Sequence, residues 1–277
     1  MAQCFSNGKI INYIVHGENG DYLMLVNGLM MTTNSWLPLI PTLKENFRVI
    51  CVDLHDMGAS EKMTEQYTVG TQCDAVLAVA DALHIQRINL CGTSYGGTVS
   101  LLFALKYPDR VNKLMVFNTL AYSDTYLTEV GRLWQKGMKS YDADEYYDCF
   151  VPFIYAPSYF EAHKENIYKR KEMLRSIFKD PKTAREYCDS IYRLSVSAEG
   201  YDVRDKLKDI QCPVLVVGCD QDYLTPMPQQ QLLSNGIPNA RFVLLPGGGH
   251  GVVYEKSELI VMLAIGWFRD IKTIPVF

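Results

Sequence analysis

Short runs of hydrophobic residues alternate along the chain with longer amphipathic stretches. The runs predict strands, which cover residues 22–26, 47–52, 87–91, 113–117, 214–217 and 241–245. The stretches between them predict helices at residues 71–83, 96–106, 227–233 and 255–268. Because the runs are apolar at successive positions, we expect both faces of each strand to be covered. The pattern therefore predicts an α/β fold with a mostly parallel central sheet flanked by helices.

Two segments depart from this alternation. Residues 9–16 and 21–26 predict a β-hairpin that adds antiparallel strands at the sheet edge. Residues 119–201 are polar, aromatic and helical in pattern, and they contain eleven of the 18 tyrosines. We predict a core formed by residues 1–118 and 202–277, with a helical cap of residues 119–201 inserted after the sixth strand. The cap is either an ordinary helical subdomain or a lid that faces a substrate.

Composition and charge exclude several classes of protein. The 277 residues are 48% hydrophobic and 21% charged, which is typical of a globular protein with one sizeable core. A net charge of −4 without a basic cluster argues against nucleic acid as a partner. No apolar run is long enough to span a bilayer, and residues 1–4 lack the pattern of a signal peptide. Eight scattered cysteines without paired spacing indicate no zinc site and fit a reducing cytoplasm, where we expect the protein to reside.

A candidate nucleophile follows the predicted strand at residues 87–91. The sequence Gly92-Thr93-Ser94-Tyr95-Gly96 has the form G-x-S-x-G and precedes a predicted helix. A serine on a tight strand-to-helix turn needs glycine two positions away on either side, because side chains there would collide with the crossing backbone. The alternative interpretation is a plain glycine-rich turn. With this motif in this context, the chain resembles the α/β-hydrolase family over nearly its whole length.

The resemblance implies that an acid and a histidine follow Ser94 in that order. The acid is expected after the strand at residues 214–217, where Asp220 and Asp222 both lie. We favour Asp222 because the spacing to Thr225 and Pro226 is typical of the family's acid loop. An acidic residue ahead of a helix would also have a non-catalytic explanation.

His250 is the candidate base. It ends a glycine run, residues 247–249, after the last predicted strand, and the resemblance places the family's histidine there. A histidine in this position can reach a serine with one ring nitrogen and a carboxylate with the other. The remaining histidines, His16, His55, His84 and His163, have no such context.

The resemblance also implies an oxyanion hole formed by two backbone N–H groups. Tyr95, after the nucleophile, supplies one, and Leu29, in the loop after the strand at residues 22–26, supplies the other. Asn27 stands where the family usually has histidine. Asp56 stands where glycine is common in another loop, to which we assign only a structural role.

These residues predict a serine hydrolase that cleaves an ester, thioester or related acyl bond of a small apolar or aromatic substrate through an acyl-enzyme on Ser94. No metal or organic cofactor is expected. One alternative is an acyltransferase that passes the same acyl group to an alcohol or amine, and another is a ligand receptor on a hydrolase scaffold. Candidate lining residues are Met30, Met31, Tyr126, Trp134, Phe150 and Tyr155. The sequence does not determine the oligomeric state.

Overall fold

The computed structural model describes residues 1–271 and contains, within that range, one eight-stranded sheet. The strands are β1 (Ala2–Ser6), β2 (Lys9–His16), β3 (Tyr22–Val26), β4 (Arg48–Asp53), β5 (Ile88–Thr93), β6 (Val111–Phe117), β7 (Val214–Cys219) and β8 (Ala240–Leu245). Their order across the sheet is β1-β2-β4-β3-β5-β6-β7-β8. Strands β3 to β8 are parallel, and β1 and β2 are antiparallel to their neighbours. The predicted α/β fold with a mostly parallel sheet is confirmed.

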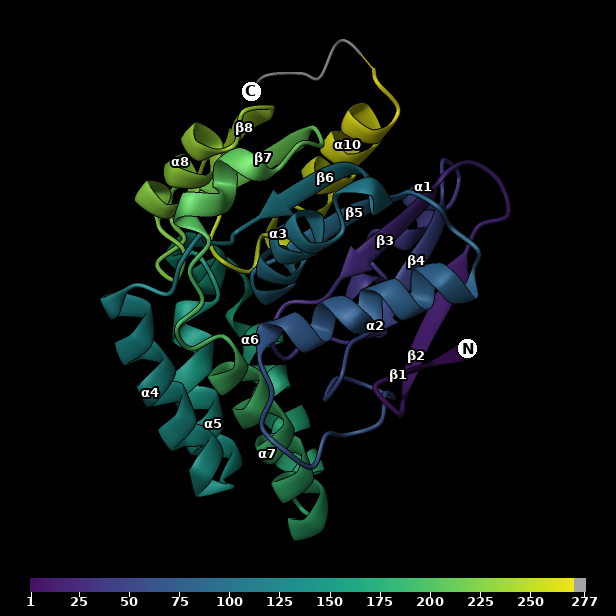
Figure 1. The fold of residues 1–277 in the computed structure, drawn as a ribbon. Coiled ribbons are helices and arrows are strands. Elements are labelled where there is room, and N and C mark those ends of the chain that lie inside the picture. Colours follow the sequence, from purple (N-terminus) through teal and green to yellow (C-terminus); the bar gives the residue numbers. More distant parts are fainter. Residues whose placement is uncertain (272–277) are drawn as a thin grey trace.

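Helices cover both faces of the sheet (Figure 1). One layer contains α2 (Val69–Ala82), α3 (Tyr95–Lys106) and α8 (Met227–Gly236), and the other contains α1 (Ile40–Leu43), α9 (Val252–Glu255) and α10 (Ser257–Phe268). In β4, Ile50 and Val52 pack against the first layer, whereas Val49 and Cys51 pack against the second. Successive residues of a central strand therefore face different helices, which explains why the predicted runs are apolar at every position.

Four further α-helices lie between β6 and β7. They are α4 (Thr125–Ser140), α5 (Ala143–Phe150), α6 (Pro157–Ile177) and α7 (Pro181–Ser197). Figure 1 shows them together on one side of the molecule, beyond the ends of β5 and β6. The predicted helical insertion after the sixth strand is thus confirmed, whereas its description as a separate domain of residues 119–201 stays a prediction. No helix within residues 1–271 is long and apolar enough to cross a membrane.

The predicted hairpin between residues 9–16 and 21–26 is wrong. Strand β2 pairs with β1 and β4, whereas β3 pairs in parallel with β4 and β5. The hairpin is formed instead by β1 and β2, through a turn in which Asn7 and Gly8 have φ angles of 50° and 73°. An Asn-Gly pair is a strong hairpin signal, but the strand before it is only five residues long and contains no continuous apolar run like those of the central strands. Hydrophobic pattern identifies a strand without identifying its neighbour.

A buried ion pair ties the inserted helices to the core. Arg193 of α7 donates from Nε and Nη2 to the two carboxylate oxygens of Asp56, at 2.9 and 2.6 Å. The Asp56 side chain is fully buried, and it also accepts a hydrogen bond from the backbone N–H of Met63. Asp56 has a φ of 65°, which aspartate adopts more readily than most residues. The aspartate at a position where glycine is common therefore anchors α7.

We expect Arg193→Gln to lower the free energy of unfolding by about 3 kcal/mol, because it leaves the buried Asp56 carboxylate without its cation. The matched control is Arg132→Gln, which breaks an exposed pair with Glu129 and should cost less than about 1 kcal/mol. Urea unfolding followed by circular dichroism measures both variants. If both variants lower the free energy of unfolding by the same small amount, the buried pair contributes no net stability.

Candidate active site

Ser94 lies on a sharp turn between β5 and α3, with φ 51° and ψ −121°. A Cβ atom at Gly96 would overlap the carbonyl group of Val26, and one at Gly92 would collide with the carbonyl oxygen of Gly96. Glycine at both positions is therefore a steric requirement of this turn. The strained backbone presents the Ser94 side chain to a cavity beneath the inserted helices.

His250 connects Ser94 to Asp222. Its Nε2 lies 2.8 Å from the Ser94 hydroxyl oxygen, and its Nδ1 lies 3.0 and 3.1 Å from the two carboxylate oxygens of Asp222. With the proton on Nδ1, the ring donates to Asp222 and leaves Nε2 free to accept from Ser94. Asp220 lies apart, where it accepts a hydrogen bond from the backbone N–H of Gly247 at 2.7 Å. The structure thus brings Ser94, His250 and Asp222 together and leaves Asp220 outside the group.

Asn118 holds both the acid and the histidine loop, and sequence reasoning missed it. Its side-chain amide donates to Asp222 at 2.7 Å and to the carbonyl oxygen of Gly249 at 2.8 Å. Thr225 donates to the same carboxylate from its hydroxyl at 2.6 Å and from its backbone N–H at 3.0 Å. The position of Asn118 directly after β6, at the carboxyl edge of the sheet, was the only available signal. It belongs to no short motif.

Burial alone would raise the pKa of the Asp222 carboxyl group, but the charge of His250 and hydrogen bonds from His250 and Thr225 outweigh it and lower that pKa. Because the pKa is lower in the folded state, ionised Asp222 stabilises the fold above its unfolded pKa of about 4. That contribution is lost as the pH falls through the folded pKa.

We therefore expect the difference in free energy of unfolding between wild type and Asp222→Asn to shrink as the pH falls below about 4. Urea titrations over a pH series measure this difference. A difference that stays constant down to the lowest pH at which both proteins fold would contradict the lowered pKa.

Two backbone N–H groups lie in residues that line a cavity beside Ser94. The N–H groups of Leu29 and Tyr95 have no hydrogen-bond acceptor among residues 1–271, and both residues line a small cavity beside Ser94. The loop that carries Leu29 is anchored by Asn27, whose side-chain oxygen accepts from the indole N–H of Trp36 at 2.6 Å. Asparagine in place of the usual histidine therefore still fixes this loop.

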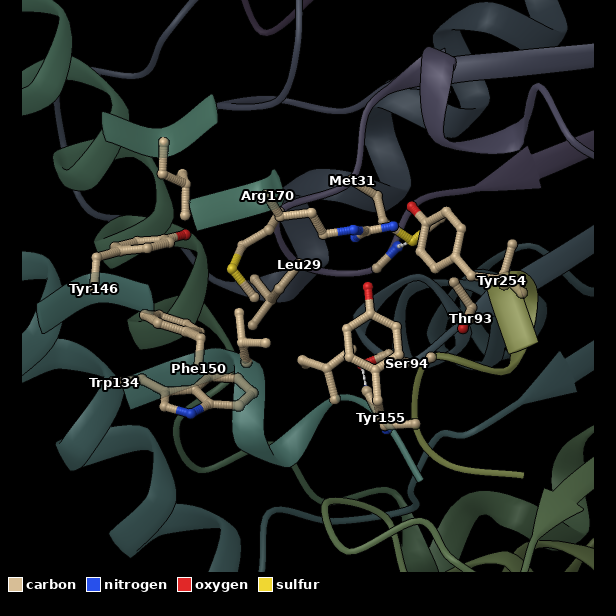
Figure 2. Close-up of a pocket in the computed structure, with 18 of the residues that line it drawn as sticks. Leu29, Met31, Thr93, Ser94, Trp134, Tyr146, Phe150, Tyr155, Arg170 and Tyr254 are labelled. Carbon is tan, nitrogen blue, oxygen red and sulfur yellow. Dashed lines mark hydrogen bonds between the residues drawn. The ribbon is translucent and has the colours of Figure 1, made fainter. Parts of the chain in front are cut away.

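Two cavities meet at Ser94 and His250. The larger one has a volume of about 180 Å³, and aromatic and aliphatic side chains form most of its wall (Figure 2). Met30, Met31, Trp134, Phe150 and Tyr155, which the sequence suggests as lining residues, are in this wall, together with Leu29, Tyr146, Met173, Leu174, Tyr187, Val253, Tyr254 and Arg170. Tyr126 does not line the cavity and is 47% exposed. A smaller cavity of about 70 Å³ lies on the Tyr95 side.

The described residues include no group of three or more His, Cys, Asp or Glu side chains arranged to hold a metal ion. Glu255 accepts hydrogen bonds from the backbone N–H groups of Gly249 and Ala156, and burial raises the pKa of its carboxyl group. It thereby links the loop of His250 to the start of α6.

The chain is similar to known proteins over most of its length. The family model for the alpha/beta hydrolase fold matches residues 21–257. A protein named "Putative carbamate hydrolase RutD" from Caulobacter sp. (strain K31) is 27% identical over 253 residues, which cover 88% of this chain and 90% of the relative. Among solved structures, MGS-M2, an alpha/beta hydrolase enzyme from a Medee basin deep-sea metagenome library, is 32% identical with a TM-score of 0.92 and covers 99% of this chain and 100% of its own.

The enol-lactonase from Burkholderia xenovorans LB400 has the same fold, with a TM-score of 0.80 at 23% identity and coverage of 97% and 100% of the two chains. The family match spans most of the chain. The chain belongs to the α/β-hydrolase family and is a hydrolase.

Proposed function

We propose that this hydrolase cleaves an ester, thioester or related acyl bond of a small, largely apolar molecule through a covalent acyl-enzyme on Ser94. The observation that carries the proposal is the continuous hydrogen-bonded chain from Ser94 through His250 to the buried Asp222. A hydroxyl group becomes a nucleophile when a neighbouring base takes its proton and a third group orients that base.

The proposed reaction has two halves. The Ser94 oxygen attacks the carbonyl carbon while its proton passes to His250, and the backbone N–H groups of Leu29 and Tyr95 stabilise the resulting oxyanion. The leaving group then takes the proton from His250 as its bond to carbon breaks. In the second half, water gives a proton to His250 and attacks the acyl carbon. The bond to Ser94 breaks, the proton returns to the serine, and a carboxylic acid is released.

The two cavities support a substrate with two parts. Because both cavities border Ser94 and His250, the acyl portion and the leaving group can occupy one each. The larger cavity is mostly apolar and small, which favours a compact acyl compound. The helices of residues 119–201 supply much of its wall, so we propose that they act as the cap of the site. The name of the relative RutD refers to a carbamate, in which the carbonyl carbon likewise carries a heteroatom leaving group.

The test is a product analysis with short-chain esters and thioesters, carried out with and without added alcohol or amine. Hydrolysis predicts release of the free acid at a rate that depends on Ser94 and is unchanged by the acceptor. A new ester or amide as the main product would assign the acyl-enzyme to transfer instead. Absence of turnover with every compound would argue against the proposal.

A further inference from the structure

One cation projects into the otherwise apolar cavity. Arg170 of α6 lines the larger cavity, and Figure 2 shows its guanidinium group extending toward Met31 and Tyr254. Within residues 1–271, no Asp or Glu carboxylate forms an ion pair with it. Two other cations of the same helix are paired, because Lys171 contacts Asp148 and Arg175 contacts Asp144.

Aromatic faces hold the Arg170 guanidinium in place. Its central carbon lies 4.6 Å from the ring centroid of Tyr254 and 5.4 Å from that of Tyr155. Contacts of this kind stabilise a cation without using its N–H groups. None of those N–H groups donates a hydrogen bond to a described protein atom, so they are free to bind a ligand. Glu255, an acid near the Tyr155 ring, accepts hydrogen bonds from backbone N–H groups at both carboxylate oxygens.

A second polar group faces the same space. The hydroxyl of Tyr155 is buried, its side chain is only 4% exposed, and it has no hydrogen-bond partner within the described part of the chain. In Figure 2 this hydroxyl points toward the guanidinium of Arg170. Burial raises the pKa of Tyr155, so its hydroxyl stays protonated and can donate. A buried donor without a partner costs free energy unless a ligand satisfies it.

We propose that Arg170 and Tyr155 form a subsite for a carboxylate group on the substrate, so that the preferred acyl compounds are monoanions. The inference rests on the proposed function for the acyl chemistry and adds the charge of the substrate. A planar guanidinium presents paired N–H groups that match the two oxygens of a carboxylate, and the apolar wall around it strengthens that pairing. A neutral ester of the same length offers these donors only an uncharged and weaker acceptor.

The test compares half-esters with their neutral diesters. Monomethyl and dimethyl succinate, glutarate and adipate place the carboxylate on the acyl part at three distances, and acetyl esters of short hydroxy acids place it on the leaving group. We expect wild type to prefer one half-ester over its diester. We expect Arg170→Gln to lower kcat/KM for that half-ester by roughly 10- to 100-fold, mainly through KM, with less than about a threefold change for the diester.

Further variants separate the subsite from a structural role. Arg170→Lys should restore part of the preference, and Tyr155→Phe should give a smaller loss, also confined to the anionic substrate. The matched control is Arg185→Gln, because Arg185 also lies over a tyrosine ring, that of Tyr141 at 4.5 Å, but does not line the cavity. It should leave both substrates unaffected.

If Arg170→Gln lowers kcat/KM equally for the half-ester and the diester, the subsite is overturned. The same holds if wild type shows no preference for any half-ester over its diester. A preference for acetylated hydroxy acids would place the carboxylate on the leaving group and would still support the subsite. Calorimetric binding of the half-esters to Ser94→Ala does not depend on turnover. If the half-esters bind to Ser94→Ala, if this binding is abolished by adding Arg170→Gln, and if wild type does not hydrolyse them, the subsite is supported. The proposed acyl chemistry then fails.

Discussion

Ser94→Ala is expected to lower kcat for hydrolysis of a good ester substrate by roughly 10⁴-fold or more. Alanine removes the only atom of this residue that can form the acyl-enzyme, and His250 Nε2 then has no hydroxyl proton to take. The oxyanion N–H groups and the cavity remain, so a small residual rate and normal substrate binding are expected. Steady-state kinetics on a short-chain ester, together with calorimetric binding, measure both quantities.

Ser140→Ala serves as the matched control, because the Ser140 hydroxyl donates to the carbonyl oxygen of Gly137 and accepts from the backbone N–H of Asp142, and it does not line the cavity at Ser94. It should retain wild-type activity. Ser94→Ala should keep a cooperative thermal transition, since the side chain of Ser94 is not part of a hydrophobic core. A folded Ser94→Ala variant with more than a tenth of wild-type kcat would exclude Ser94 as the nucleophile.

Asp222→Asn is expected to reduce kcat by roughly 10³- to 10⁴-fold while Asp220→Asn leaves it within about twofold. The Asp222 carboxylate fixes the His250 tautomer and stabilises the imidazolium that forms when the ring takes the serine proton. An asparagine amide can present a donor to Nδ1, which favours the wrong tautomer. Asp220 accepts only from the backbone of Gly247 and does not contact the histidine.

The two aspartates thus form a matched pair on one loop, which the same ester assay and a pH-rate profile can compare. Comparable reductions in kcat in both variants would show that the loop as a whole, and not the contact with His250, determines the rate. The reverse ranking would transfer the role of the acid to Asp220.

Local pattern predicted the central sheet well because its strands are buried on both faces. The run at residues 22–26 coincides with β3, and that at residues 214–217 lies within β7. The first strand was less predictable, since β1 is short and has no continuous apolar run, and strand pairing is a long-range property. The helix predicted at residues 255–268 corresponds to α10 and begins two residues later, because Lys256 has non-helical backbone angles.

Ser94, Asp222 and His250 could be selected from sequence because each follows a strand in a recognisable short motif. Asn118 could not, because its role depends on two partners more than 100 residues away, Asp222 and Gly249. The place of Arg170 in the cavity could not be predicted from the sequence either. It occurs in a helix rich in lysine, arginine and glutamate, where a charged residue normally faces solvent, and only the three-dimensional structure shows it in the cavity.

The central claim is that Ser94 is an activated nucleophile, and covalent labelling tests it most directly. Wild type, Ser94→Ala and His250→Ala are incubated with a fluorophosphonate probe, which reacts with serines that a neighbouring base activates. The labelled peptide is then located by mass spectrometry. We expect the label on Ser94 in wild type and its loss in both variants. A folded wild type that takes no label, or a label that persists in His250→Ala at the wild-type rate, would contradict the claim.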